Sequence, residues 1–166
     1  IEQEKIINKE TMPESGEIKM AEIVKILSDK TNGESVVVAD VGQHQMKAAR
    51  YYRFKHPHSM ITSGGAGTMG YALPAAIGAK FAAGDNREVI AIIGDGSFQM
   101  TLQEMITVMQ EKLPVKIIIF NNEYLGMVRQ WQQLFFDRRY SSVNLDNPDF
   151  IKIAEACSIK AKKVIK

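Results

Sequence analysis

Two short polar motifs contain the residues best suited to bind a metal ion and a phosphate group. The first is Gly94-Asp95-Gly96-Ser97, and the second is Asn121-Asn122. A carboxylate such as Asp95 and an amide such as Asn122 offer the oxygen ligands that Mg²⁺ or Ca²⁺ requires. Glycine allows the main chain to approach a ligand closely, and a helix that starts after Gly96 and Ser97 would present free N–H groups to a phosphate. The motifs together therefore indicate a cation and phosphate site.

Each motif follows a short apolar run that is rich in β-branched residues. Three such runs are predicted to be strands, at residues 35–40, 88–94 and 115–121. Their continuous apolar character is typical of parallel strands that are covered on both faces. The 24 residues from 97 to 120 are enough for one helix and one strand. Both motifs should therefore end on the same edge of the sheet, so that Asp95 and Asn122 converge.

Helical patterns alternate with these runs. They are predicted from Glu17 to the Asn32-Gly33 stop, over 69–83, over 101–112, and after Asn147-Pro148, with Asn147 as N-cap. A last strand is predicted over 160–165. The alternation predicts an α/β, doubly wound domain with a mostly parallel sheet and helices on both faces. Residues 1–16 are interpreted as a linker or the remnant of a preceding segment, and 17–166 as one domain that is truncated at its C-terminus.

Composition excludes several classes of function. The chain has 166 residues, of which 45% are hydrophobic, and its 21 basic and 19 acidic residues form no basic block. Binding to nucleic acid or to an anionic membrane is therefore not predicted. The apolar runs are too short to span a bilayer. Cys157 is the only cysteine, so no intrachain disulfide is expected and the default setting is reducing and cytoplasmic.

The stretch from Gly94 to Asn122 resembles the signature of thiamine-diphosphate enzymes. The resemblance implies that Asp95, Asn122 and the main-chain carbonyl of Tyr124 hold Mg²⁺ against the cofactor diphosphate. It extends over most of residues 17–166. The cofactors implied are thiamine diphosphate and Mg²⁺.

A second glycine motif, from Gly65 to Gly70, has the form G-x-G-x-x-G and precedes a predicted helix. This spacing is also typical of a dinucleotide-binding oxidoreductase, which remains an alternative. The short, polar segment at 58–63 and the pairing of Asp95 with Asn122 count against it. Similarity to thiamine enzymes implies instead that the Gly67 carbonyl and the Met69 amide contact the aminopyrimidine ring. The Met69 side chain would then support the bent cofactor.

Two further stretches resemble acetolactate (acetohydroxyacid) synthases. The first is VGQHQM, from Val41 to Met46, and it implies diphosphate contacts for Gln43 and His44. The second is GMVRQWQ, which starts at Gly126. There the resemblance assigns Met127 to the cofactor, and Val128 and Trp131 to the pocket for the substrate.

The resemblance implies a reaction in which pyruvate is decarboxylated and condensed with a second 2-ketoacid, pyruvate or 2-ketobutyrate, in branched-chain amino-acid biosynthesis. No catalytic side chain is expected within this chain, because the activating glutamate should come from a missing domain of a second catalytic subunit. FAD and a small regulatory subunit belong to the expected full-length enzyme. Exposed surface left by the missing domains predicts a homo-oligomer. Pyruvate oxidase, glyoxylate carboligase, a catabolic acetolactate synthase and a non-catalytic binding module remain alternatives.

Overall fold

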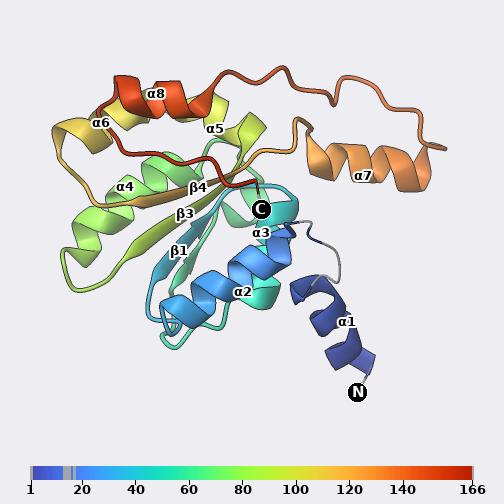
Figure 1. Ribbon diagram of the computed structural model, residues 1–166, viewed down its shortest axis with the longest axis horizontal. Coiled ribbons are helices and arrows are strands. Elements are labelled where there is room, and N and C mark those ends of the chain that lie inside the picture. Colours follow the sequence, from blue (N-terminus) through green and yellow to red (C-terminus); the bar gives the residue numbers. More distant parts are fainter. Residues whose placement is uncertain (1, 13–15, 17, 166) are drawn as a thin grey trace.

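A sheet of four parallel strands forms the centre of the molecule (Figure 1). This computed structural model describes residues 2–12, 16 and 18–165. The strand order is β2-β1-β3-β4. The strands are β1 (Val36–Ala39), β2 (Met60–Ile61), β3 (Val89–Gly94) and β4 (Lys116–Phe120). Three of them lie within the predicted runs, and the predicted parallel α/β architecture is confirmed. The two-residue strand β2 was not predicted, because its surroundings are polar.

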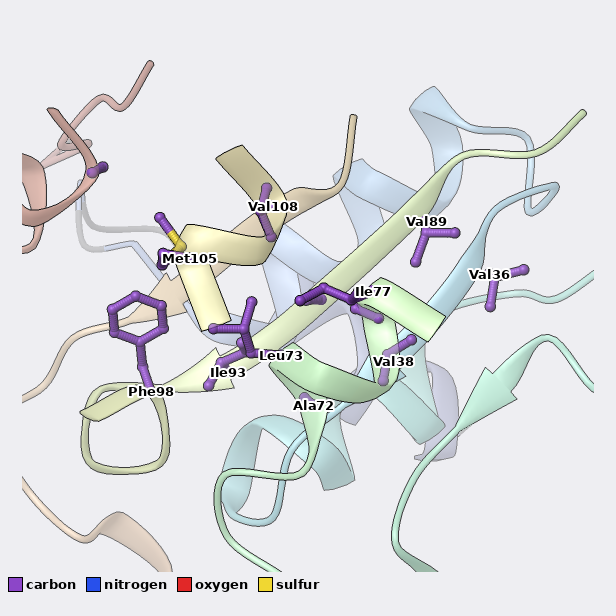
Figure 2. Close-up of a cluster of buried hydrophobic side chains, with 13 residues drawn as sticks. Val36, Val38, Ala72, Leu73, Ile77, Val89, Ile93, Phe98, Met105 and Val108 are labelled. Carbon is purple, nitrogen blue, oxygen red and sulfur yellow. The ribbon is translucent and has the colours of Figure 1, made fainter. Parts of the chain in front are cut away.

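Successive residues of the strands point to opposite faces of the sheet, as a period of two requires. Val36 and Val38 of β1 pack in one hydrophobic core, whereas Val37 and Ala39 pack in a second core on the other face. Residues of β3 alternate between the same two cores. Figure 2 shows the first core, in which Ile93 and Phe98 lie near Leu73 and Met105. The continuous apolar runs therefore arise because both faces of the sheet are covered.

Helices supply the other half of each core, and both layers are visible in Figure 1. The first core is covered by α4 (Ala72–Ala83), α5 (Asp95–Thr101), α6 (Met105–Gln110) and α8 (Phe150–Ala156). The second is covered by α2 (Met20–Lys30) and α3 (Gln43–Tyr51). A further helix, α7 (Gly126–Phe135), extends away from both layers. None of the helices in the described part of the chain is long and apolar enough to cross a membrane.

Helix boundaries differ from the predicted ones in the middle of the chain. The helix predicted over 69–83 begins only at Ala72, after a 3₁₀ turn, η1 (Gly64–Ala66). The helix predicted over 101–112 is divided between α5, a 3₁₀ turn, η2 (Leu102–Glu104), and α6. Because α5 follows β3 without a loop, Asp95 is its first residue. An acidic side chain in the first turn is favoured by the partial positive charge of a helix N-terminus.

Two predictions near the C-terminus are wrong. No strand forms over 160–165, where the described chain is irregular and the side chains of Val164 and Ile165 are exposed. These apolar residues have no neighbouring strand against which to be buried, and Lys166 lies outside the described residues. The N-cap of α8 is Asp149 rather than Asn147, because the Asp149 carboxylate accepts hydrogen bonds from the N–H groups of the first turn.

Part of the N-terminal segment is helical. Most of it forms α1 (Glu2–Thr11), which packs against α2 and is joined to α3 by an ion pair between Glu10 and Lys47. Whether this helix is the remnant of a preceding segment stays a prediction. Glu17, where the domain was predicted to begin, lies outside the described residues. The predicted stop of α2 is confirmed, since Asn32 and Gly33 adopt positive φ angles directly after it.

Candidate functional site

The carboxyl ends of β1 and β3 lie side by side at the point where the chain changes direction across the sheet. From β1 the chain crosses to β2 on one side, and it then returns to form β3 on the other side of β1. Ligands of open α/β sheets bind at such a switch point. The residues that directly follow these strands, Asp40 and Asp95, are both buried. The fold therefore puts two carboxylates at the edge where a ligand is expected.

Asp95 is linked directly to the loop that follows β4. Its Oδ2 accepts a hydrogen bond from the Glu123 N–H at 2.7 Å, and its Oδ1 accepts one from the Gly96 N–H at 3.0 Å. The two sequence motifs thus converge on the same edge of the sheet, as their spacing predicts. Asn122 lies between the motif partner Asn121 and Glu123, and its side chain is exposed.

A tight turn shapes the predicted metal ligands of this loop. Glu123 adopts a φ of 63°, and the Asn122 Oδ1 accepts a hydrogen bond from the Tyr124 N–H at 3.2 Å. This is an Asx-type turn, in which a side-chain oxygen replaces a main-chain acceptor.

One residue of the site was missed by the sequence analysis. Asn147 donates from Nδ2 to the Asp95 Oδ2 at 2.7 Å and to the Asn121 Oδ1 at 2.8 Å. Its own Oδ1 accepts from Nε2 of Gln99 at 2.8 Å. The local pattern around Asn147 suggested only a helix cap, so no signal in the sequence indicated this contact.

His44 is buried beside the same edge. Burial lowers the pKa of His44 to about 4, although Asp40 and Asp95 act in the opposite direction. The imidazole is therefore neutral near pH 7. Its Nε2 is the one buried side-chain nitrogen or oxygen in the described part of the chain that has no hydrogen-bond partner. Buried polar atoms are almost always paired, so this nitrogen suits a ligand group at the edge of the sheet.

Two glycines allow close packing around these groups. A Cβ on Gly94 would lie 2.9 Å from Cε1 of His44. A Cβ on Gly96 would lie 2.9 Å from Cδ2 of Leu125 and 3.8 Å from Cε of Met69. Any larger residue at these two positions would press against side chains that surround the predicted diphosphate site. Glycine in the Gly94–Ser97 motif is thus required by close packing.

The second glycine motif reaches the same site through Asp40. The carboxylate of Asp40 accepts hydrogen bonds from the N–H groups of Gly70 at 3.0 Å and Ala72 at 2.8 Å. These bonds attach the start of α4 to the end of β1. Gly67 has a φ of 59°, and the side chain of Met69 extends toward Gly96. Asp40 was not singled out from the sequence as a site residue, because a single aspartate after a strand is a weak signal.

The remaining predicted residues lie at the start of α3 and on α7. Gln43 is hydrogen-bonded to Gln130 of α7, and its Oε1 lies close to Gly126. Ser97 is buried within α5, and Met127 is half-buried. The exposed fractions of Val128 and Trp131, the predicted pocket residues, are 46% and 59%. The described chain therefore forms at most one wall of a substrate pocket.

The donor set fits a diphosphate with a divalent cation better than a free metal ion. Among the described residues, no group of three or more His, Cys, Asp or Glu side chains is placed to hold a metal. A cation near Asp95 would therefore depend on amide, carbonyl and ligand oxygens. Magnesium is commonly bound in this way, by one or two carboxylates together with phosphate oxygens. The unpaired His44 nitrogen suits the anionic partner.

Comparison with known protein families decides between a thiamine and a dinucleotide site. Residues 40–166 match the family described as thiamine pyrophosphate enzyme, C-terminal TPP binding domain. The chain belongs to this family. Thiamine pyrophosphate is another name for thiamine diphosphate. Membership of the TPP-binding domain family thus confirms the predicted cofactor class and sets the dinucleotide alternative aside.

Acetolactate synthases are among the relatives of this TPP-binding domain. The chain is 51% identical over 143 residues to the acetolactate synthase isozyme 2 large subunit of Escherichia coli, covering 86% of this chain and 26% of that protein. It is 53% identical over 152 residues to the mitochondrial acetolactate synthase catalytic subunit of Saccharomyces cerevisiae, covering 90% of this chain and 22% of that protein. The chain thus spans about a quarter of the length of the curated relatives that it matches.

A solved structure supports the fold of the TPP-binding domain. The thiamine diphosphate-dependent 4-hydroxybenzoylformate decarboxylase of Rhodococcus jostii RHA1 superposes with a TM-score of 0.85 at 25% sequence identity. The superposition covers 95% of this chain and 29% of that protein. The architecture described above is therefore also found in one part of a thiamine diphosphate-dependent enzyme.

Proposed function

We propose that the chain is the cofactor-binding part of an acetolactate synthase catalytic subunit. One observation carries the proposal: Asp95 at the end of β3 is hydrogen-bonded to Glu123 in the loop after β4, so the two polar motifs form one site. The chain shares about half of its aligned residues with acetolactate synthase subunits, and its candidate site residues lie at one edge of the sheet. Both observations support assignment to this enzyme.

In this proposal the side chains of Asp95 and Asn122 and the carbonyl of Tyr124 hold Mg²⁺. The diphosphate is bound by Gln43 and His44 and by the main chain at Gly96 and Ser97. His44 is neutral near pH 7, so it contributes a hydrogen bond rather than a positive charge. Charge neutralisation of the diphosphate therefore depends on the metal and on the N-terminal end of α5.

The opposite end of the cofactor is assigned to the glycine loop and α7. The Gly67 carbonyl and the Met69 amide bind the aminopyrimidine, Met127 contacts the thiazolium side, and Val128 and Trp131 line the 2-ketoacid pocket. Thiamine diphosphate, when bound, supplies the electron sink for decarboxylation of the ketoacid. The side chains of this chain orient that group and keep water from one side of it.

The remaining parts of the active site are proposed to lie in other segments. They include the activating glutamate of a second catalytic subunit, further substrate contacts and, in the full enzyme, FAD and a regulatory subunit. The exposed apolar residues of α7 support an assembly in which a partner covers that helix. A cytoplasmic setting stays a prediction, since the relatives named above include a mitochondrial subunit.

Calorimetric titration of this chain tests the proposal. Thiamine diphosphate with Mg²⁺ is expected to bind, and NAD is not. Asp95→Asn should weaken the cofactor binding, while Asp85→Asn, which changes an exposed aspartate between α4 and β3, should leave it unchanged. Equal binding by Asp95→Asn and the unmodified chain would contradict the assignment of the metal site.

A second experiment addresses the reaction. Acetolactate formation from pyruvate is not expected from this chain alone, and it should appear when the chain is expressed within a full-length subunit. Turnover by the isolated chain would contradict the division of the active site between two subunits. Release of acetaldehyde without acetolactate by the full-length subunit would instead indicate a decarboxylase.

A further inference from the structure

We infer that Asn147 is a positioning residue for the Asp95 carboxylate and sets which of its oxygens is available to a divalent cation. This inference rests on the proposed function and extends it to a residue outside the sequence motifs. Asn147 lies 52 positions after Asp95, on the irregular segment that joins α7 to α8. It would act through Asp95 rather than by touching the cofactor.

The two carboxylate oxygens of Asp95 accept different numbers of hydrogen bonds. Oδ2 accepts two hydrogen bonds at 2.7 Å, one from the Glu123 N–H and one from Nδ2 of Asn147. Within the described part of the chain, Oδ1 accepts only one, from the Gly96 N–H at 3.0 Å. A carboxylate oxygen has two lone pairs, so Oδ2 is fully occupied and Oδ1 keeps one free. A cation would therefore be bound by Oδ1 alone, as a monodentate ligand.

The amide of Asn147 has only one orientation that satisfies its neighbours. Its Oδ1 accepts from Gln99, and its Nδ2 donates both hydrogens, one to Asp95 and one to Asn121. Turning the amide over would bring its oxygen against two acceptor oxygens and leave the Gln99 donor facing an N–H group. Because this amide is fixed from three sides, it can hold the carboxylate in one rotamer before any ligand binds.

The segment that contains Asn147 is itself attached to the metal loop. Leu125 N–H donates to the Val143 carbonyl at 2.8 Å, and Leu145 N–H donates to the Glu123 carbonyl at 2.9 Å. These main-chain bonds join the segment before α7 to the segment after it. These bonds do not involve the Asn147 side chain. Replacing Asn147 should therefore change the orientation of the Asp95 carboxylate without detaching the segment.

Metal selectivity separates positioning from a general structural role. Mg²⁺ requires near-octahedral geometry with monodentate oxygens, whereas Ca²⁺ accepts bidentate carboxylates. Asn147→Ala would free one lone pair of the Asp95 Oδ2. It would also allow the Asp95 carboxylate to adopt other rotamers. In the presence of thiamine diphosphate, Mg²⁺ affinity is expected to fall about 10- to 100-fold, the range typical of outer-shell changes. Ca²⁺ affinity should fall by a clearly smaller factor.

The measurement is calorimetric titration of each metal into the chain with saturating thiamine diphosphate. The matched control is Asn144→Ala, which removes an exposed asparagine from the same segment and should leave both affinities unchanged. Gln99→Met serves as a second variant, because it keeps Asn147 but removes the bond that orients its amide, together with the longer bond from Gln99 to the Asp95 main-chain carbonyl at 3.3 Å. Like Asn147→Ala, it should lower the affinity for Mg²⁺ more than the affinity for Ca²⁺. Thermal unfolding confirms that each variant is folded.

The outcomes distinguish this inference from the proposed function. If the unmodified chain binds no metal with thiamine diphosphate, the proposed function is wrong and the inference with it. If the unmodified chain binds but Asn147→Ala shows the same affinities, or loses Mg²⁺ and Ca²⁺ equally, only the positioning role is overturned. A selective loss of Mg²⁺ supports it.

Discussion

Gln43, in the first turn of α3, donates a hydrogen bond to Oε1 of Gln130 on α7, with an Nε2–Oε1 distance of 2.8 Å. The two residues are 87 positions apart in the chain. No residue of α7 is buried, and several of its apolar side chains are exposed, namely Val128, Trp131, Leu134 and Phe135. The Gln43–Gln130 bond is therefore a main attachment of α7 to the body of the domain. It also connects a predicted diphosphate ligand to the helix of the predicted substrate pocket.

Removing this attachment should loosen α7. Gln130→Ala loses one neutral hydrogen bond, which contributes about 0.5–1.5 kcal/mol and corresponds to roughly a 2- to 10-fold change in a local opening equilibrium. Hydrogen exchange of the α7 amides should accelerate by that factor. Acrylamide quenching of Trp131, the only tryptophan, should increase. Gln133→Ala, an exposed glutamine of the same helix, is the control, and equal exchange in the two variants would refute the attachment.

Two glycines that lie within helices should respond oppositely to alanine. Gly96→Ala brings a Cβ within 2.9 Å of Leu125 and 3.1 Å of Leu145, so the free energy of unfolding should fall by about 1–3 kcal/mol. Gly78→Ala on α4 meets no atom within 4 Å and should raise it by roughly 0.5–1 kcal/mol. Urea unfolding measures both. A stabilising effect of Gly96→Ala would show that the start of α5 is not closely packed.

The buried His44 should make stability depend on pH. Its pKa of about 4 in the folded chain lies below the ordinary 6.5, mainly because burial disfavours the charged ring. As pH falls from 6.5 to 4, the unfolded chain therefore binds a proton before the folded chain does. The free energy of unfolding should decrease over this interval, by at most about 3 kcal/mol, and should not depend on His44 above it.

His44→Asn should remove this decrease, whereas His58→Asn, which changes an exposed histidine, should retain it. The measurement is urea unfolding at several values between about pH 5 and 6.5. The lowered pKa of the Glu10 carboxyl, caused mainly by its hydrogen bond with Lys47, acts below the ordinary value of 4.5 and so outside this window. A pH dependence that persists in His44→Asn would assign it to other groups.

The corrected start of α8 can be tested with two aspartates. Asp149→Ala removes the acceptor for the N–H groups of Ile151 and Lys152 and should lower the free energy of unfolding by about 0.5–2 kcal/mol. Asp146→Ala changes an exposed aspartate three positions earlier and should have little effect. Thermal melting compares the two variants. A larger effect at Asp146 would place the helix start nearer to the sequence-based prediction at Asn147.

Local patterns account for the parts of the fold that were predicted correctly. The strands β1, β3 and β4 are apolar except at Lys116, the first residue of β4, because both faces of the sheet are covered, and that property is visible in a single segment. The run at 160–165 is apolar only at Ala161, Val164 and Ile165, and it lacks a partner strand in the described chain, so it remains irregular. Local pattern thus predicts a strand only where the tertiary structure supplies a neighbour.

By itself, the sequence determined three strands of the sheet, the family and the motifs that lie at the edge of the sheet, since strand-to-helix spacing is enough to bring Asp95 and the 121–123 loop together. The tertiary structure alone decided which groups hold these motifs in place. Asp40 reaches Gly70 across 30 positions, and Asn147 reaches Asp95 across 52. Side-chain hydrogen bonds over such separations depend on the packing of distant segments, which no local periodicity or motif records.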